Sequence, residues 1–447
     1  MKFDDVKEFL IAEADRKGLE GYEVYYMESS DMSAETLKDE ISSFSSGVRG
    51  GVCFRCIVDG RMGYASSELF EEEEMKALVA RAIENAKNIE NDDKAILFGG
   101  SKKYETPNIP NTDAADAASL KRIALWMQDN TYKSSEYITD GTQSAAFESK
   151  IRTELMNSFG LRLSNSVSIC GAYVQSVVSK DGESEEGFDF AIGLDEQNLL
   201  EISKSATADA LSKIGAQEID TGKYDIVISG KRTKDILSSY ASSFSGREAQ
   251  LGMSRLREKE GQKIAADIIN IIDDPMREES TMQTPFDGEG VAAYKKTVIE
   301  KGVLKTLLYD LTTANKKGIE STGNGQRVSY STPVHIAPYS FYIEGGEIPC
   351  DELIGRVSDG IYINEFKGMH AGCNSVTGDF SIESAGYRIR DGKICEAIRS
   401  FTVAGNFFDL LMNIEEISNS VSFGIPSGYT CFGAPDILVR GMSVAGK

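Results

Sequence analysis

The chain has 447 residues, which is enough for two or three domains with buried cores that do not need disulfides. Its 70 acidic and 48 basic residues give a formal charge of −22, which disfavours direct nucleic-acid binding and anionic membrane surfaces. Seven irregularly spaced cysteines and an N-terminus unlike a signal peptide predict reduced thiols in a cytoplasmic protein with no membrane partner.

The chain opens with a helix and a group of strands. A helix capped by Asp4 or Asp5 and ended by Gly18 is predicted from apolar residues that share one face. Partial alternation of apolar and polar residues over 21–67 predicts strands, and Asp59-Gly60 is typical of a hairpin turn.

The same mixture of helices and strands continues to the middle of the chain. An amphipathic helix is predicted over 71–89, followed by a polar connector at 101–113 and a helix near 114–130. Strands are expected over about 136–192, and a helix near 195–214. These elements predict an N-terminal mixed α/β domain over 1–218.

A polar connector meets an apolar strand within 216–230, and the domain boundary is placed there. Helices are predicted at 233–246 and near 258–266, and most of the remaining chain reads as short strands with glycine turns. The second half therefore predicts a β-rich, barrel- or sandwich-like C-terminal domain over 219–447. The predicted fold class is α+β.

Two segments carry candidate chemistry. Asp287 and Glu289, in "TPFDGEGVA", are two carboxylates in a glycine loop, a spacing compatible with acid/base work or a hard-metal site. A tight turn in which the aspartate binds its own backbone explains them as well. His370, in "GMHAGCNSVTGDF", lies among glycines that let a ligand approach the backbone closely. The other histidine, His335, reads as a packed strand residue, so the sequence offers no catalytic triad.

Two further motifs are better explained by structure than by chemistry. Cys53 and Cys56 have the spacing of metal and redox pairs, but residues three apart on a strand point to opposite faces. The segment "STGNGQR" at 321–327 lacks the lysine and the strand-to-helix setting of a phosphate-binding loop. We therefore expect no site at either motif.

Several longer segments of the second half form one combined pattern. They are "PFDGEGVAAYKKTVIEKGVLKTLLYDLTTANKKG" at 285–318, "STGNGQR", "KGMHAGCNSVTGDFSIESAGYRIRDGKI" and "FTVAGNFFDLLMNIEEI" at 401–417. Together these segments closely resemble the TldD/PmbA family, once called modulators of DNA gyrase. Their order and spacing cover most of 223–447. The resemblance implies an N-terminal α/β domain, a β-rich C-terminal domain, and dimers that enclose a chamber for unfolded peptides.

The family has two branches, and the first helix of the C-terminal domain distinguishes them. TldD-like subunits carry His-Glu-x-x-x-His there, which supplies two zinc ligands and a carboxylate that activates water. Here the helix reads "DILSSYASSFSGREAQ", so the chain resembles the PmbA/TldE-like branch, as does its ending "GAPDILVRGMSVAG". The resemblance implies no catalytic residue, no metal site and no cofactor in this chain, with zinc expected in a TldD-like partner.

The resemblance also implies a role for the candidate residues and a partner. Residues expected to line the chamber are His370, Cys373, Asn374, Thr377, Asp379, Asp287 and Glu289. The expected partners are a TldD-like metallopeptidase subunit or a second copy of the chain, and the expected substrate is an unfolded peptide. One alternative is an independent peptidase or hydrolase that uses Asp287, Glu289 and His370. Another is a gyrase-linked regulatory binding protein.

Overall fold

The computed structural model describes residues 2–90, 93–108 and 115–447. Within these residues, the first half of the chain forms a six-stranded antiparallel sheet with the order β3-β2-β1-β4-β5-β6. Its strands are β1 (Tyr22–Leu37), β2 (Glu40–Val58), β3 (Arg61–Ser67), β4 (Gln143–Asn157), β5 (Arg162–Lys180) and β6 (Glu183–Ile192). Asp59 and Gly60 both have positive φ between β2 and β3, which confirms the predicted hairpin.

Helices cover one face of this sheet. They are α1 (Phe3–Arg16), α2 (Glu72–Asn88), α3 (Ala117–Ser134) and α4 (Glu196–Ser212). Their apolar faces bury Leu10 and Leu78 at one end of the sheet and Leu120 and Leu199 at the other. The four predicted helices are confirmed, although Lys2 is the N-cap of α1 and Asp5 instead accepts the Lys2 backbone N–H. The predicted connector at 101–113 lies partly outside the described residues.

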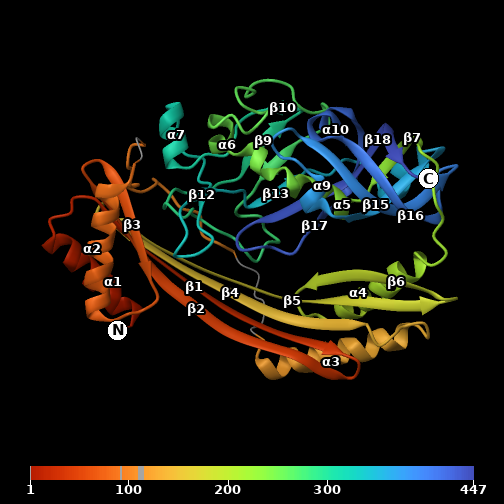
Figure 1. Cartoon of the computed structure of the whole chain (residues 1–447), viewed down its shortest axis with the longest axis horizontal. Helices are drawn as coiled ribbons and strands as arrows, with labels where there is room; N and C mark the ends of the chain where they lie inside the picture. The colour runs from red at the N-terminus through yellow and green to blue at the C-terminus, as the bar shows by residue number, and fades with distance from the viewer. Residues whose placement is uncertain (1, 91–92, 109–114) are drawn as a thin grey trace.

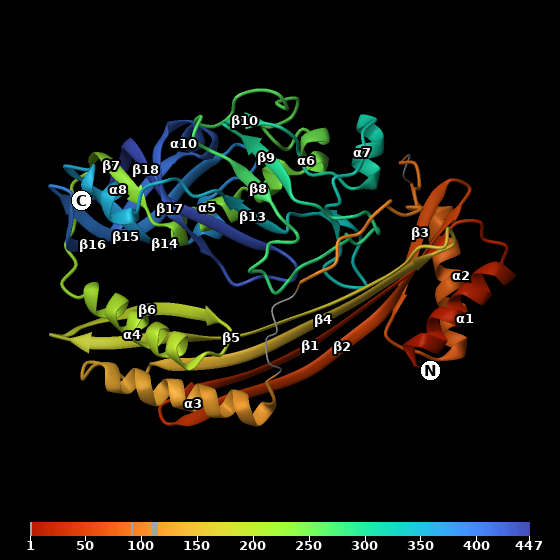
Figure 2. The same cartoon turned by 180° about the vertical axis from the view of Figure 1, so that it is seen from behind.

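The opposite face of the sheet is concave and turns toward the second half of the chain (Figures 1 and 2). Alternation along the strands places Tyr25, Cys53 and Ile169 on this face, where they pack with Met282 from the second half. Cys56 packs with the helices instead. The two cysteines therefore point to opposite faces, as the strand periodicity predicts.

The second half forms a larger sheet that closes on itself. Its strands are β7 (Gly222–Ile228), β8 (Ile271–Asp273), β9 (Lys296–Glu300), β10 (Val303–Leu304), β13 (Ser340–Ile343), β14 (Asp359–Lys367), β15 (Asp379–Arg390), β16 (Lys393–Asn406), β17 (Ile414–Phe423) and β18 (Cys431–Ala445). Five strands follow one another in the order β18-β16-β15-β14-β7, and β7 pairs in turn with β18, which closes the ring. This closed ring confirms the α+β fold class with a β-rich, barrel-like second half. The domain boundary at 218/219 stays a prediction.

The helices of the second half are shorter than the sequence predicts. The expected helix at 233–246 is divided into α5 (Gly230–Ser239), a 3₁₀ turn (Ala241–Phe244) and the beginning of α6 (Gly246–Gln250). The expected helix near 258–266 is wrong, because that segment forms turns and Glu258 has a positive φ. Further short helices are α7 (Leu311–Lys317), α8 (Cys350–Gly355), α9 (Met369–Gly372) and α10 (Phe407–Asn413). In the described part of the chain, no helix has both the length and the apolar character needed to span a membrane.

Candidate functional site

A buried ionic cluster joins the concave face of the first sheet to the second half of the chain. Glu23 on β1 is fully buried and accepts hydrogen bonds from Arg55 on β2 at 2.7 and 2.9 Å. Arg327, which follows the short strand β11 (Gly325–Gln326), donates to the same carboxylate at 2.5 Å. Burial alone would raise the pKa of Glu23, but the charges of the two arginines outweigh it and hold the pKa below its ordinary value. Glu23 is therefore ionised at neutral pH.

Asp287 organises the turn that the glycine loop forms. Its Oδ1 accepts the backbone N–H groups of Glu289 at 2.9 Å and of Val291 at 3.0 Å, and its Oδ2 accepts that of Gly325 at 2.9 Å. The residue is only 1% exposed, so both of its oxygens are committed to the backbone. Of the two interpretations that the sequence leaves open for Asp287, this geometry favours the turn.

Glu289 has a different environment, although it lies two residues away. Its Oε2 accepts the backbone N–H of Leu311 at 2.8 Å, and its Oε1 lies 4.0 Å from a guanidinium nitrogen of Arg55. Burial, and then the neighbouring charge of Asp287, raise the pKa of Glu289 above the ordinary glutamate range. A buried carboxyl of this kind holds its proton near neutral pH and is suited to acid/base work. Glu23, Arg55, Arg327, Asp287 and Glu289 are called the buried charge cluster below.

Glu289 faces a cavity of about 800 Å³ between the two halves of the chain. The first half contributes residues of β2 and β3, including Arg55, and the second half contributes residues of α6, α7 and the segment that contains Arg327. A cavity of this size accommodates a small molecule or a short peptide. No local sequence pattern predicts this cavity, because its walls come from segments that are far apart along the chain.

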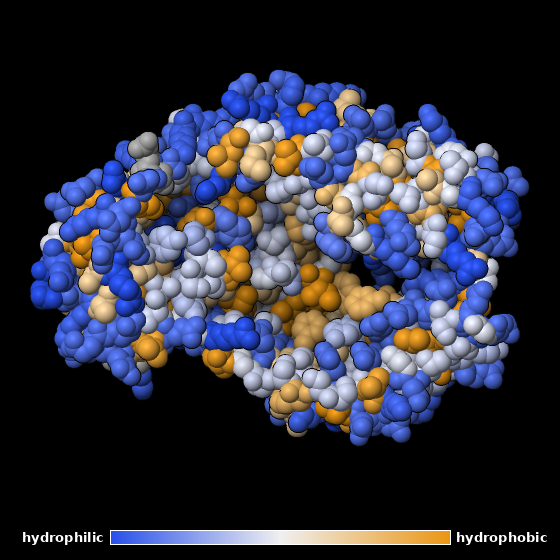
Figure 3. Space-filling model, viewed as in Figure 1, coloured by the Kyte–Doolittle hydropathy of each residue, from blue (hydrophilic) through white to orange (hydrophobic). Residues whose placement is uncertain are grey.

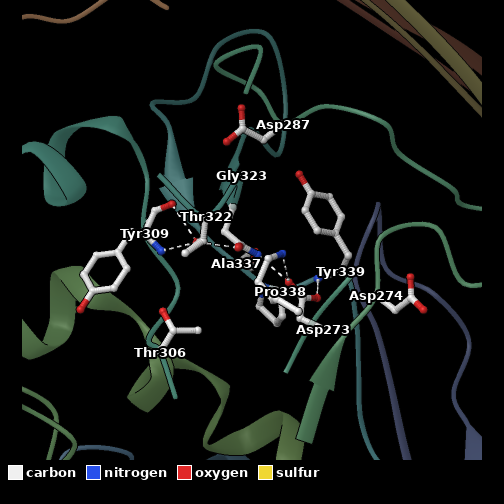
Figure 4. Close-up of polar contacts among 12 residues, drawn as sticks. Asp273, Asp274, Asp287, Thr306, Tyr309, Thr322, Gly323, Ala337, Pro338 and Tyr339 are labelled. Carbon is white, nitrogen blue, oxygen red and sulfur yellow. Dashed lines mark hydrogen bonds and ion pairs between the residues drawn. The ribbon is translucent and has the colours of Figure 1, made fainter. Parts of the chain in front are cut away.

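A second buried polar group supports the loop "STGNGQR". Asp273 on β8 accepts hydrogen bonds from the side chains of Lys296 at 3.0 Å and Asn324 at 2.8 Å, and from the backbone of Tyr339 at 2.7 Å. Figure 4 shows Asp273 and Tyr339 of this group, with Asp287 lying apart from Asp273. The contacts explain the polar residues of the loop as supports of the fold, which agrees with the loop interpretation of this motif.

His370 lies in the short helix α9, and its side chain is exposed. Gly368, which caps this helix, has a φ of +67°, a conformation that few residues other than glycine adopt. His335, by contrast, is half-buried on the two-residue strand β12 (His335–Ile336) and agrees with the predicted packed strand histidine.

The residues after His370 form a tight turn that is stabilised by local hydrogen bonds. The side chain of Asn374 accepts the backbone N–H groups of Val376 at 3.0 Å and Thr377 at 3.1 Å. Asp379 accepts a hydrogen bond from the side chain of Asn406 at 2.9 Å, and both Asn374 and Asp379 are exposed. Residues 368–379 are called the 368–379 turn below.

This turn packs against the end of α5 and the 3₁₀ turn that follows. The Tyr240 hydroxyl donates to the Asp379 carbonyl at 2.7 Å, and the Ser243 hydroxyl donates to the Ser375 carbonyl at 3.0 Å. Cys373 lies beside Tyr240, and burial raises the pKa of its thiol. The structure thus brings His370, Cys373, Asn374, Thr377 and Asp379 together in one segment. Among the described residues, no hydrogen bond or ion pair joins Asp287 or Glu289 to His370.

The chain matches three domains of one protein family. Residues 22–86 match the PmbA/TldA metallopeptidase domain 1, residues 111–214 the central domain, and residues 221–446 the C-terminal domain. The chain belongs to the PmbA/TldD metallopeptidase family.

Individual members of the family resemble the whole chain. TldE from Thermococcus kodakarensis has a TM-score of 0.90 and 25% identity, and the match covers 99% of this chain and all of that one. A Thermotoga maritima protein described as a candidate modulator of a DNA gyrase has a TM-score of 0.89 and 26% identity over the same shares. The uncharacterized protein MJ0231 of Methanocaldococcus jannaschii is 28% identical over 90% of this chain and 92% of its own length.

Membership of a metallopeptidase family raises the question of whether this chain fits zinc. The polar side chains that the segment 235–246 places against the 368–379 turn include the hydroxyls of Ser239, Tyr240 and Ser243. Zinc in proteins is bound by thiolate, imidazole and carboxylate ligands. Across the described residues, no three histidine, cysteine, aspartate or glutamate side chains gather to hold a metal ion. The residues of this segment therefore do not fit a zinc site.

Proposed function

We propose that the chain is a PmbA/TldE-like, non-catalytic subunit of a TldD/TldE-type metallopeptidase complex. The observation that carries this proposal is the set of hydroxyl side chains on 235–246, where TldD-like subunits are expected to carry the zinc motif. The segment has no imidazole, and its one carboxylate, that of Asp235, pairs with Arg232 and Lys234, so the segment cannot activate water through a bound metal. The role left to the chain is to shape the space in which a partner cleaves peptides.

The shape of the chain supports an enclosing role. Figure 3 shows a hollow between the first sheet and the second half, with apolar side chains at its base. Gly187 of β6 packs against α4, so Phe188 and Phe190 lie on the opposite, concave face. Phe188 is 50% exposed, and its ring centre lies 5.8 Å from that of Tyr173 on β5. Exposed aromatic side chains of this kind can bind the apolar residues of an unfolded peptide.

The hollow is open, and a second subunit would close it. The likeness to TldE from Thermococcus kodakarensis supports a TldD-like protein as that subunit, and a second copy of this chain is the alternative. In the heteromeric arrangement the partner would supply the zinc and the catalytic residues. This chain would supply the concave wall and the 368–379 turn, and the complex would work in the cytoplasm.

The test compares the purified chain alone with the chain co-purified with a TldD-like protein from the same organism. Metal analysis, light scattering and cleavage of an unfolded peptide are measured for both samples. We expect no stoichiometric zinc and no cleavage for the chain alone, and cleavage by the complex. About one zinc per chain together with cleavage by the chain alone would contradict the proposal. A single species of 48.8 kDa that associates with no TldD-like protein would contradict the pairing.

One observation favours a second candidate function, an independent hydrolase. Glu289 lines the cavity of about 800 Å³ and has a raised pKa, as a general acid or base requires. If this candidate is right, the isolated chain hydrolyses a peptide and Glu289→Gln removes at least about 99% of that activity. If the chain alone has no activity, or if the variant keeps it, the hydrolase candidate fails.

A further inference from the structure

We infer that the cavity between β2–β3 and α6–α7 binds the carboxylate groups of a peptide. This binding site is separate from the 368–379 turn, and only the choice of a peptide as ligand rests on the proposed function. The inference comes from three properties of the cavity, which are its surplus of positive charge, its apolar walls and its size.

Three cationic side chains at the cavity have no ion pair within the described residues. Arg61 lies at the start of β3, Lys94 lies in the segment after α2, and Arg247 lies on α6. All three are exposed, and they come from three separate parts of the chain. In a chain with a formal charge of −22, unpaired cations around one cavity favour an anionic ligand.

The other charges at the cavity already have partners. Lys316 pairs with Asp93 at 2.6 Å, and Lys317 pairs with Glu260. Asp310 caps α7 by accepting the backbone N–H of Thr313 at 2.7 Å. The two ion pairs are neutral and Asp310 keeps one negative charge, so the three cations Arg61, Lys94 and Arg247 still leave a surplus of positive charge.

The floor of the cavity does not cancel this surplus. Arg55 and Arg327 share the single carboxylate of Glu23, which leaves one positive charge unbalanced by that contact. Asp287 is turned to the backbone, and Glu289, which lines the cavity beside Arg55, holds its proton more readily than an exposed glutamate. An anionic group that enters the cavity is therefore repelled little by Glu23, Asp287 and Glu289.

The walls and the size of the cavity favour a peptide over a small inorganic anion. Met62, Ile96 and Val334 contribute apolar surface to the cavity. A volume of about 800 Å³ is far larger than a phosphate ion requires and lies in the range of sites for extended organic ligands. A short peptide can place its carboxylates at the cations and its apolar side chains against these walls.

The experiment measures binding of fluorescently labelled peptides to the full chain by anisotropy. One peptide alternates Glu and Leu and ends in an amide, and a second alternates Gln and Leu and ends in a free carboxylate. A third alternates Gln and Leu and ends in an amide. We expect the first or the second peptide to bind at least about tenfold more tightly than the third, and the preferred one identifies the source of the carboxylate.

Variants locate the site. The double variant Arg61→Glu with Arg247→Glu should weaken binding of the preferred peptide at least about tenfold, because two attractions become repulsions. Lys204→Glu is the matched control, since Lys204 is exposed on α4, has no ion pair within the described residues and lies outside the cavity. We expect the control to bind as the wild type does. Circular dichroism checks that all variants are folded.

Three results would overturn the inference. These are equal binding of all three peptides, equal weakening by Lys204→Glu and by the double variant, and displacement of the peptide by inorganic phosphate at a lower concentration than by acetate. Binding is measured on the isolated chain, so a missing TldD-like partner leaves this test intact. Conversely, loss of peptide binding here leaves the zinc and co-purification results of the proposed function unchanged.

Discussion

The sequence singles out two members of the buried charge cluster, Asp287 and Glu289, and the 368–379 turn, yet the structure gives the cluster and the turn opposite surroundings. In the cluster, Glu23 is fully buried and Glu289 is 4% exposed, and long-range contacts join the two halves of the chain. In the turn, His370 and Asp379 are exposed, and hydrogen bonds between near neighbours in the sequence hold part of its backbone.

Burial changes how much the loss of an ionic contact lowers the free energy of unfolding. Water and salt screen an exposed carboxylate, so the loss of its contacts changes the free energy of unfolding little. A buried charge that loses its partner cannot regain the solvation that it gave up on folding. We therefore expect substitutions in the cluster to act on stability and pH dependence, and substitutions in the turn to act on substrate handling alone.

The largest effect is expected for Arg327→Ala. Removing this guanidinium leaves the fully buried Glu23 with one partner and breaks the link between the two halves. We expect the free energy of unfolding to fall by about 3–5 kcal/mol, measured by urea denaturation. The control is Arg440→Ala, because Arg440 pairs with two acids at the surface and should cost only about 0–1 kcal/mol. Equal effects of the two variants would show that the buried ion pair of Arg327 contributes no more to stability than a surface ion pair.

The next effect is expected for Asp287→Asn. The amide keeps the shape of the side chain but has only one oxygen for the three backbone N–H groups that Asp287 now accepts. At least one buried donor is left unsatisfied, which costs about 1–3 kcal/mol in the free energy of unfolding. A variant as stable as the wild type in urea would show that this turn does not depend on the carboxylate.

An effect that depends on pH is expected for Glu289→Gln. The pKa of Glu289 is higher in the folded chain than in the unfolded chain, so the folded state keeps its proton as the pH rises. As the pH rises from the ordinary glutamate pKa to the raised one, the free energy of unfolding therefore falls, by up to about 1.4 kcal/mol per pH unit. Glutamine cannot ionise, so the variant should lose less stability than the wild type between mildly acidic and mildly alkaline pH.

Thermal unfolding at several pH values measures this difference. The matched control is Glu201→Gln, because Glu201 is an exposed glutamate on α4. The control should follow the wild-type pH profile. An unchanged profile for Glu289→Gln would contradict the raised pKa.

The smallest effect on stability is expected for His370→Ala and Asp379→Ala. Both side chains are exposed, and Asp379 contributes a surface hydrogen bond to Asn406. We expect the urea midpoints to equal that of the wild type within error. In the complex with a TldD-like subunit, peptide turnover should fall by less than about tenfold, as the loss of a positioning contact does. A loss of a hundredfold or more would assign these residues to the catalytic machinery and contradict the non-catalytic role.

Local patterns predicted most of the first half correctly. The apolar period over 71–89 gives α2, and Asp59-Gly60 gives the hairpin between β2 and β3, because each depends on neighbours along the chain. The second half was harder to predict. Its long strands β15, β16 and β18 contain irregularities and close into a ring, so their register depends on pairing rather than on alternation alone.

By itself, the sequence determined the α+β class, the family resemblance and the absence of the zinc motif from 235–246, since all three depend on residue types at fixed spacing. Only the tertiary structure decided which charges meet. Glu23, Arg55 and Arg327 are separated by many elements, and no local pattern records that they share one buried contact. The same holds for the cavity and for the raised pKa of Glu289, because burial and the neighbouring charges that set them are properties of the folded chain.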